Sequence, residues 1–471
     1  MASPGITIVA GTDLPYHFLY GALPNYVLVA IDQELSYKPV GYDRTDAYLR
    51  GDWDGRVQLF KQSRSGSSWY FASGLLSRVT NVLDIFGVPY TVQEATPKEF
   101  DPHGFEWVSP LTLRSYQQTA VDKAYAAGGG VISLPTGAGK TVVGLKLVSM
   151  FDVPTLILVH TKELLYQWKD EIKLHLGVDA GLVGDGQADF RAITVATLQT
   201  IGGMIRSGDI QRLEFGMLLL DECHRVGAEV AYNIAMRCTA RIRYGLSATP
   251  TRTDNAELKI FAATGPLIAN LTPCDLIKAG YLAKPKLTLV SVGGSPGFFS
   301  QSWQKEYVAH IVTNDERNDK IVDEVVRLVR EGKQTYIHVE RVAHMDILYH
   351  RLVKEFDPQK VARIWGKTKT DDRQKMLKRF ESGSLNVLIG TILKEGVNLP
   401  AMDAIVLAGG LSSPVALVQK VGRALRRNER FDHAEIIDFV DNCGRFCKKH
   451  SELRYQAFME YYGDCIEIVR V

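Results

Sequence analysis

The chain has 471 residues, of which 46% are hydrophobic and 23% charged, and its formal net charge is +2. This length predicts two to four domains, because one domain holds roughly 100–200 residues. The apolar runs are strand-sized, whereas a membrane span needs about 20 apolar residues, so we expect a cytoplasmic protein without membrane spans. Six widely scattered cysteines favour a reducing compartment over a disulfide framework.

Residues 1–100 mix short β-like runs with one helix, which predicts a small α+β domain. The expected β-like runs are Ile6–Ala10, Tyr26–Ile31 and Val57–Phe60, and the expected helix is Ser73–Phe86. Residues 1–105 hold eight Lys/Arg and eleven Asp/Glu, a net charge of −3. Global charge therefore neither supports nor excludes a nucleic-acid partner, because a motor needs only a local basic lining. The polar stretch Glu94–Pro102 predicts a linker.

From residue 111 onward, apolar strands alternate with helical segments, the pattern of a parallel α/β sheet. The pattern runs to about residue 265 and resumes after 270, which predicts domains at 101–268 and 269–471. The expected strands of the first are Val131–Leu134, Thr155–Val159, Ala192–Ala196, Met217–Leu220 and Ile242–Leu246. Those of the second are Lys286–Val292, Thr335–Val339, Val361–Trp365, Asn386–Gly390, Ala404–Ala408 and Glu435–Phe439.

The segment Leu134–Thr141 reads LPTGAGKT between an apolar strand and an apolar helix, Val142–Met150. That context is typical of a phosphate-binding loop, although Leu134 replaces the first glycine of the strict pattern. Backbone N–H groups at a helix N-terminus hold phosphates. We therefore expect ATP contacts from Thr136, Gly137, Ala138, Gly139, Lys140 and Thr141, with Lys140 on the β/γ-phosphates and the Thr141 hydroxyl on Mg²⁺.

The second chemical element is Phe215–His224, which reads FGMLLLDECH. Four apolar residues predict a buried strand, and two carboxylates follow at its carboxyl end. Asp221 is placed to hold Mg²⁺, and Glu222 to orient or deprotonate the attacking water. The pair of motifs predicts an ATP hydrolase.

Together these motifs resemble those of superfamily 2 helicases, since DECH is a form of the DExH box. Similar motifs recur in order from residue 111 to about 455, and they imply two RecA-like lobes that hydrolyse ATP while moving along a strand. The resemblance assigns the adenine to Gln117, coupling to His224, Ser247 and Thr249, and strand contacts to Thr161, Thr197 and Thr391. In the second lobe it implicates Gly396 in nucleotide binding and Gln419, Arg423 and Arg426 in catalysis, the two arginines as γ-phosphate fingers.

The N-terminal region narrows the family further. Arg50–Phe60 reads RGDWDGRVQLF, which resembles the duplex-binding domain of phage UvsW-type helicases and implies DNA contacts from Arg50, Trp53 and Arg56. Thr313–Asn318, His450 with Ser451, and Arg454 also resemble features of this group. The implied function is remodelling of branched DNA, including Holliday-junction migration, fork regression and unwinding, with recombination and replication proteins as possible partners.

Alternative functions remain open from the sequence alone. The TRTD segment after Pro250 resembles XPB-like DNA helicases, so an XPB-like or restriction-type duplex translocase is the first alternative. An RNA helicase is disfavoured by the WDGR segment, and a non-motor DNA-binding scaffold by the intact motifs.

Overall fold

The computed structural model describes residues 5–12, 14–94, 100–223, 228–248, 257–293, 302–391, 402–410, 431 and 433–471. The chain divides into two compact units. One comprises residues 1–134 and 138–270, and the other comprises 271–471 together with 135–137. No helix among the described residues is long and apolar enough to cross a membrane.

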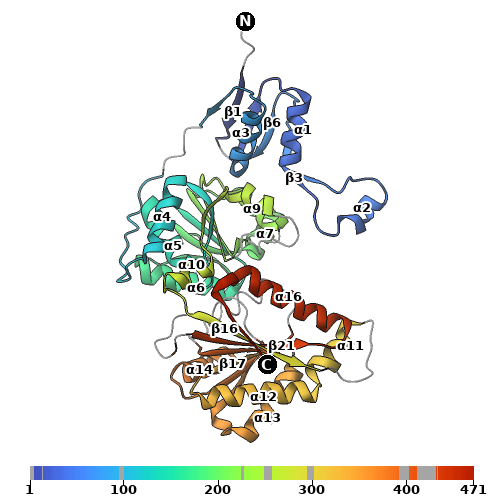
Figure 1. Ribbon diagram of the computed structural model, residues 1–471. Coiled ribbons are helices and arrows are strands. Elements are labelled where there is room, and N and C mark those ends of the chain that lie inside the picture. Colours follow the sequence, from blue (N-terminus) through green and yellow to red (C-terminus); the bar gives the residue numbers. More distant parts are fainter. Residues whose placement is uncertain are drawn as a thin grey trace. The chain divides into compact units, whose positions relative to one another are not determined.

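The N-terminal part of the first unit is a five-stranded sheet with two helices, as expected for a small α+β domain (Figure 1). The sheet order is β5-β6-β2-β1-β7. Its strands are β1 Ile6–Ala10, β2 Tyr16–Tyr20, β5 Phe60–Gln62, β6 Trp69–Ala72 and β7 Tyr90–Gln93, and its helices are α1 Asn25–Glu34 and α3 Leu76–Ile85, which follows the short turn η2 Ser73–Leu75.

An arm leaves this sheet between α1 and β5 (Figure 1). Its base is the antiparallel pair β3 Ser36–Tyr37 and β4 Val57–Gln58, and its tip carries η1 Tyr42–Arg44 and α2 Asp46–Leu49. The RGDWDGR segment therefore lies on the arm and not within the main sheet.

One predicted element of this region is wrong. The run Tyr26–Ile31 was expected to be β-like, but it lies inside α1. Val27 and Ile31, four residues apart, are both fully buried, whereas Val29 is 46% exposed. Burial thus follows the helical period and not the alternation of a strand.

The rest of the first unit, lobe 1, is an eight-stranded sheet in the order β11-β10-β12-β9-β13-β14-β8-β15. All its pairs are parallel except β10 with β11. The strands are β8 Gly129–Ser133, β9 Thr155–Val159, β10 Gly181–Gly184, β11 Gln187–Ala188, β12 Ile193–Thr197, β13 Met217–Asp221, β14 Ile242–Ser247 and β15 Leu267–Asn270. The helices are α4 Ser115–Ala127, α5 Lys140–Phe151, α6 Lys162–Leu176, α7 Leu198–Ser207, α8 Ala228–Ala235 and α9 Glu257–Thr264.

The N-terminal sheet and lobe 1 share one hydrophobic core. Met236, Leu258 and Ala262 of lobe 1 are buried in the same cluster as residues of β1, α1 and α3. Gly74 permits this packing, because a Cβ at that position would lie 2.0 Å from the carbonyl oxygen of Phe261 in α9. The N-terminal region therefore packs against α9 and against Met236, which directly follows α8.

The second unit, lobe 2, is a fully parallel seven-stranded sheet in the order β18-β19-β17-β20-β21-β16-β22. Its strands are β16 Lys284–Val292, β17 Thr335–His338, β18 Val361–Ile364, β19 Val387–Gly390, β20 Ala404–Leu407, β21 His433–Asp441 and β22 Glu467–Arg470. Its helical elements are α10 Pro273–Lys278, α11 Trp303–Tyr307, η4 Val308–Val312, α12 Asp315–Arg330, α13 Val342–Glu355, η5 Pro358–Lys360, α14 Thr370–Glu381, α16 Arg445–Tyr462 and η6 Gly463–Cys465.

Helices cover both faces of this second sheet (Figure 1). Residues of α12 and α13 fill one core cluster, and residues of α14 and α16 fill the other. Two α/β lobes with parallel sheets confirm the predicted fold class.

One disulfide is present, although the scattered cysteines argue against a disulfide framework. Cys274 of α10 and Cys465 of η6 are bonded, with Cα atoms 5.5 Å apart. The two cysteines are separated by 191 residues, and they meet because α10 packs against η6 and α16. Cys223, Cys238, Cys443 and Cys447 are free thiols.

Candidate ATP and DNA sites

The loop between β8 and α5 requires glycine at two positions. Gly137 and Gly139 adopt φ angles of +85° and +80°, which residues with a Cβ rarely adopt. A Cβ on Gly139 would also lie 2.4 Å from Nε2 of Gln117. The loop delivers Lys140 and Thr141 to the first turn of α5, where free backbone N–H groups and the helix dipole favour a phosphate.

Gln117 contacts this loop directly. Its Nε2 donates to the carbonyl oxygen of Ala138 at 2.9 Å, and its Oε1 accepts from the backbone N–H of Arg114 at 2.9 Å. The hydroxyl of Tyr116 donates to the same Ala138 oxygen at 3.0 Å. Gln117 therefore helps to set the conformation of the loop, and its contact with adenine stays a prediction.

The predicted motifs of lobe 1 meet at one edge of the sheet. Strands β12, β9, β13, β14 and β8 are successive parallel neighbours, so their carboxyl ends lie side by side, where α/β proteins bind ligands. Asp221 ends β13 and Ser247 ends β14. The backbone N–H of Leu134 donates to the carbonyl oxygen of Ser247 at 2.9 Å, which connects the start of the loop to the end of β14.

Asp221 and Glu222 form a buried acidic pair at that edge. Burial, followed by the charge of Glu222, raises the pKa of Asp221 to about 6. Glu222 has a φ of +47°, a strained backbone conformation that clusters at functional sites. Its Oε1 lies 3.4 Å from Nζ of Lys140, and both side chains are 11% exposed. The structure thus brings together three residues predicted to act on ATP.

Mg²⁺ is chemically compatible with this edge. It prefers oxygen donors, and the carboxylate of Asp221 and the hydroxyl of Thr141 are of that kind. Burial and the charge of Glu222 raise the pKa of Asp221, and a bound cation would act in the opposite direction.

Trp168 is a site residue that the sequence did not reveal. It lies on α6, is 1% exposed, and donates from Nε1 to Oδ2 of Asp221 at 2.8 Å. This hydrogen bond lowers the pKa of Asp221 against the effect of burial. A lone tryptophan in an amphipathic helix resembles an ordinary core residue, so no sequence signal marks it.

The predicted strand contacts in lobe 1 cap helices. The side chain of Thr161 accepts from the N–H of Leu164 at 3.2 Å at the start of α6, and that of Thr197 accepts from the N–H of Thr200 at 3.4 Å at the start of α7. In lobe 2, Thr391 follows β19, and its N–H donates to the carbonyl oxygen of Ile364 at 3.2 Å. Contact with a strand stays a prediction for all three.

The three predicted DNA contacts on the arm differ in their exposure and in their hydrogen-bond partners. The Arg50 side chain is 66% exposed and pairs with Asp52 at 2.9 Å. Arg56 is 27% exposed, lies 3.2 Å from Asp32 and also donates to Ser36. Trp53 donates from Nε1 to the carbonyl oxygen of Arg56 at 2.7 Å. Trp53 and Arg56 therefore hold the arm together, whereas Arg50 faces solvent.

Six predicted site residues lie outside the described part of the chain. They are His224, Thr249, Gly396, Gln419, Arg423 and Arg426.

Two family models match the chain. Residues 110–252 match the res subunit of type III restriction enzymes, and residues 316–428 match the helicase conserved C-terminal domain. The first range contains the phosphate loop and the acidic pair, and the second contains the segment with Gln419, Arg423 and Arg426. The matches therefore support an ATPase of the helicase type.

Similar proteins include DNA motors. The DNA 3'-5' translocase XPB2 of Sulfurisphaera tokodaii is 28% identical over 70% of this chain and 82% of its own length. The ATP-dependent DNA helicase uvsW of Enterobacteria phage T4 is 23% identical over 87% of this chain and 86% of its own length. A fragment of a putative HsdR subunit of a type I restriction enzyme from Vibrio vulnificus aligns with a TM-score of 0.58 at 18% identity, covering 99% of this chain and 92% of that one. The last likeness supports the two-lobed helicase fold.

Proposed function

Because this chain belongs to the superfamily 2 helicases, with relatives among the UvsW and XPB proteins, we propose that it is an ATP-driven DNA motor that remodels branched DNA. Its reactions would be branch migration of four-way junctions, fork regression and unwinding of joint molecules. An XPB-like or restriction-type duplex translocase is the alternative, favoured by the 28% identity to the XPB2 translocase.

The observation that carries the motor function is the cluster of Lys140, Asp221 and Glu222 at one sheet edge. Lys140 and Glu222 form an ion pair that is almost buried. A phosphate bound by the α5 N-terminus would compete with Glu222 for Lys140, because a phosphate carries more charge than a carboxylate. Lys140 would then hold the phosphates, and Glu222 would be released to orient and deprotonate the attacking water.

Other residues of the chain complete the proposed reaction. Asp221 and Thr141 would hold Mg²⁺, which when bound neutralises charge on the β- and γ-phosphates. Ser247, bonded through its carbonyl to the phosphate loop, with His224 and Thr249, would pass the state of the nucleotide to the strand contacts. Gln117 and Gly396 would contact the nucleotide. Gln419, Arg423 and Arg426 would act at the γ-phosphate.

Recognition of branched DNA is assigned to the N-terminal region. Lobe 1 and lobe 2 hold all motifs for ATP and for a single strand, including Thr161, Thr197 and Thr391, so a separate region has to select the branch. The arm offers an exposed arginine, Arg50, for phosphate contact. Arg56 and Trp53 would act by keeping the arm folded.

The test compares ATPase stimulation by single-stranded, duplex, forked and four-way DNA and by RNA, alongside four-way-junction unwinding and duplex translocation. Strongest stimulation and unwinding with junctions supports branch remodelling. Equal activity on plain duplex without junction unwinding supports the translocase. Preference for RNA, or the absence of nucleic-acid-stimulated ATPase activity, contradicts both proposals.

The arm is tested with Arg50→Ala, which should weaken junction binding and reduce its salt slope by about 1 while single-strand-stimulated ATPase stays unchanged. Arg191→Ala is a matched control, because the Arg191 side chain is 50% exposed and likewise pairs with a nearby aspartate, Asp189, at 2.8 Å. It precedes β12 and so lies at the amino edge of the sheet, opposite the ATP edge. Equal effects of both variants would contradict a role for the arm.

A further inference from the structure

An exposed ion pair lies at the edge of lobe 1 where the strand contacts are proposed. Lys162 is the first residue of α6 and directly follows Thr161, which caps that helix. Its ammonium group pairs with the carboxylate of Asp185, which directly follows β10. The two side chains are 65% and 34% exposed, so solvent and ligands can reach both charges.

A tight turn fixes the position of Asp185. Gly184 pairs with Gln187 in the β10–β11 hairpin, so the connecting turn consists of Asp185 and Gly186. Their φ angles are +51° and +80°, and two positive φ angles are typical of two-residue hairpin turns. A Cβ on Gly184 would lie 2.9 Å from Cγ2 of Thr197. The close approach of these strands keeps the turn beside Thr197, the second proposed strand contact.

A second donor orients the carboxylate of Asp185. The hydroxyl of Tyr166, one turn along α6 from Lys162, donates to Oδ2 of Asp185 at 3.0 Å. Lys162 donates to the other oxygen, Oδ1. These hydrogen bonds, first that of Lys162 and then that of Tyr166, lower the pKa of Asp185. Asp185 is therefore negatively charged at neutral pH and is held facing Lys162.

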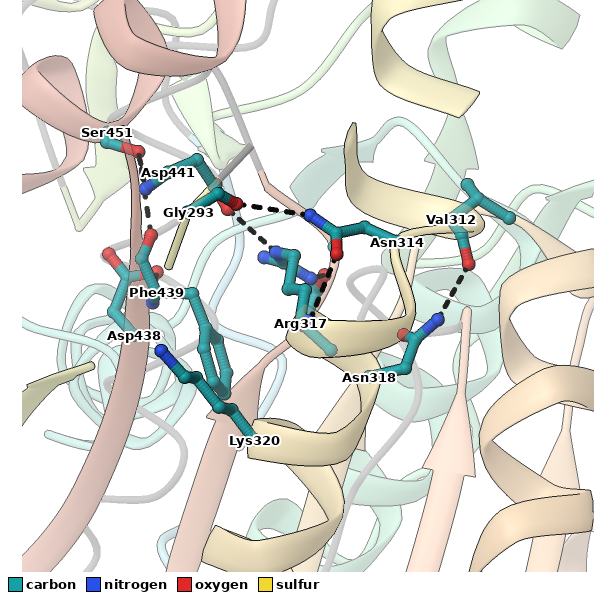
Figure 2. Close-up of polar contacts among 12 residues, drawn as sticks. Gly293, Val312, Asn314, Arg317, Asn318, Lys320, Asp438, Phe439, Asp441 and Ser451 are labelled. Atoms are coloured by element: carbon teal, nitrogen blue, oxygen red, sulfur yellow. Dashed lines mark hydrogen bonds and ion pairs between the residues drawn. The ribbon is translucent and has the colours of Figure 1, made fainter. Parts of the chain in front are cut away.

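This pair differs from the buried ion pairs of the protein in its access to ligands. Arg317 of α12 and Asp441 of β21 are 0% and 1% exposed, and the guanidinium donates to the carboxylate inside lobe 2 (Figure 2). A ligand cannot reach such a pair. Exposed ion pairs, in contrast, are weak, so an approaching anion can replace Asp185 as the partner of Lys162.

The phosphates of a DNA strand are the anions expected at this edge. Thr161 adjoins Lys162 in the chain, and Thr197 lies beside the turn that carries Asp185. A strand that contacts both threonines would pass close to the ion pair. Its phosphates would be attracted by Lys162 and repelled by Asp185.

We propose that Asp185 competes with a DNA phosphate for Lys162 and thereby weakens the hold of lobe 1 on the strand. The inference rests on the proposed function, in which Thr161 and Thr197 contact that strand. When a phosphate binds Lys162, Asp185 keeps its hydrogen bond from Tyr166 and stays ready to take the lysine back. A motor that moves along a strand has to release each phosphate again, and a competitor within the protein favours that release.

Lys173 and Asp179 provide a matched control pair. They lie 3.0 Å apart, and their side chains are 56% and 65% exposed. Lys173 is on the same helix as Lys162, about 16 Å further along its axis. Asp179 precedes β10, so this pair lies at the amino edge of the sheet, opposite the proposed strand contacts. The two pairs have no residue in common.

The experiment measures the affinity of the full chain for a single-stranded DNA oligonucleotide by fluorescence anisotropy at several salt concentrations. Asparagine has the size of aspartate and tolerates a positive φ, so Asp185→Asn removes the charge and keeps the turn. We expect this variant to bind about two- to fivefold more tightly, the range that an exposed ion pair contributes. Lys162→Gln should bind more weakly and reduce the salt slope by about 0.7, the value for one phosphate of a single strand. Lys173→Gln and Asp179→Asn should bind like the parent.

A double variant tests whether Asp185 acts through Lys162. In a Lys162→Gln background, Asp185→Asn should raise the affinity by a smaller factor, because no ion pair remains to be broken. Unchanged or weaker binding by Asp185→Asn, an equal gain in Asp179→Asn, or an equal gain in the double variant would overturn the inference. If Asp185→Asn does not fold, an unchanged salt slope in Lys162→Gln overturns it.

The parent chain separates this inference from the proposed function. A parent that binds DNA, with variants that bind equally well, contradicts the role of Asp185 alone. A parent that binds no DNA and whose ATPase activity is not stimulated by nucleic acid contradicts the proposed function, and the inference fails with it.

Discussion

The hydrogen bond from Trp168 to Asp221 gives a direct test of the proposed metal site. Trp168→Phe keeps an aromatic ring in the core but removes the N–H that donates to Oδ2 of Asp221 at 2.8 Å. The carboxylate is only 6% exposed, so water cannot readily replace the lost donor. We expect weaker Mg²⁺ binding and therefore a higher Mg²⁺ requirement for ATP hydrolysis.

The size of the effect follows from the role of Trp168 in orienting the carboxylate of Asp221 for the metal. Loss of a hydrogen bond to a metal ligand typically costs about 10–100-fold in metal affinity or activity. The Mg²⁺ concentration for half-maximal ATPase activity should therefore rise by about 10–100-fold.

The assay titrates Mg²⁺ at saturating ATP and DNA, with a thermal melt to confirm folding. Trp107→Phe is the control, because the Nε1 of Trp107 donates at 3.4 Å to the carbonyl oxygen of Leu111 and not to the acidic pair. A folded Trp168→Phe variant with the Mg²⁺ requirement of the parent would refute the assignment of Asp221 as a metal ligand positioned by Trp168.

Three further predictions concern single residues. Lys140→Ala should reduce ATP hydrolysis to below a few per cent of the parent rate and retain DNA binding, as measured by an ATPase assay and a DNA titration. Substantial residual hydrolysis would contradict the role of Lys140 in holding the phosphates. Glu222→Gln should bind nucleotide normally but turn over about 10²–10⁴-fold more slowly, and a collapse of nucleotide affinity would make Glu222 structural. Burial, then the charge of Arg317, lowers the pKa of His344 to about 3. As the pH falls through about 6.5, His344 therefore gains a proton in the unfolded chain but not in the folded protein, so the free energy of unfolding decreases. Between pH 7 and pH 5, the free energy of unfolding should decrease by about 2 kcal/mol less in His344→Gln than in the parent. Equal decreases, measured by urea titration, would contradict the lowered pKa of His344.

The parallel strands could be predicted because their burial leaves a plain pattern in the sequence. Met217–Asp221, for example, is buried at every position, so a continuous apolar run followed by carboxylates marks both the strand and its chemical end. The same pattern predicted Asp221 and Glu222, and the glycine-rich loop between a strand and a helix predicted Lys140. The fold brings all three to one edge.

Other features depend on contacts between segments far apart in the sequence. Trp168 meets Asp221 across 53 residues, and Arg317 meets Asp441 across 124. Neither contact follows from local spacing. Arg56 was predicted to touch DNA from the resemblance of its segment, which does not reveal its pairing with Asp32, because that pairing depends on how the arm folds back onto α1.

The close packing at Gly74 limits how the N-terminal region can be truncated or exchanged. Loss of residues 1–100 would uncover Met236, Leu258 and Ala262, which are buried in the shared core, and an exposed apolar patch promotes aggregation. A truncated chain would therefore fail for reasons unrelated to DNA. Exchange of the N-terminal region between relatives would likewise succeed only where the transplanted region has glycine at the position that faces the carbonyl oxygen of Phe261. The two parts are expected to change together during evolution, as halves of one folding unit.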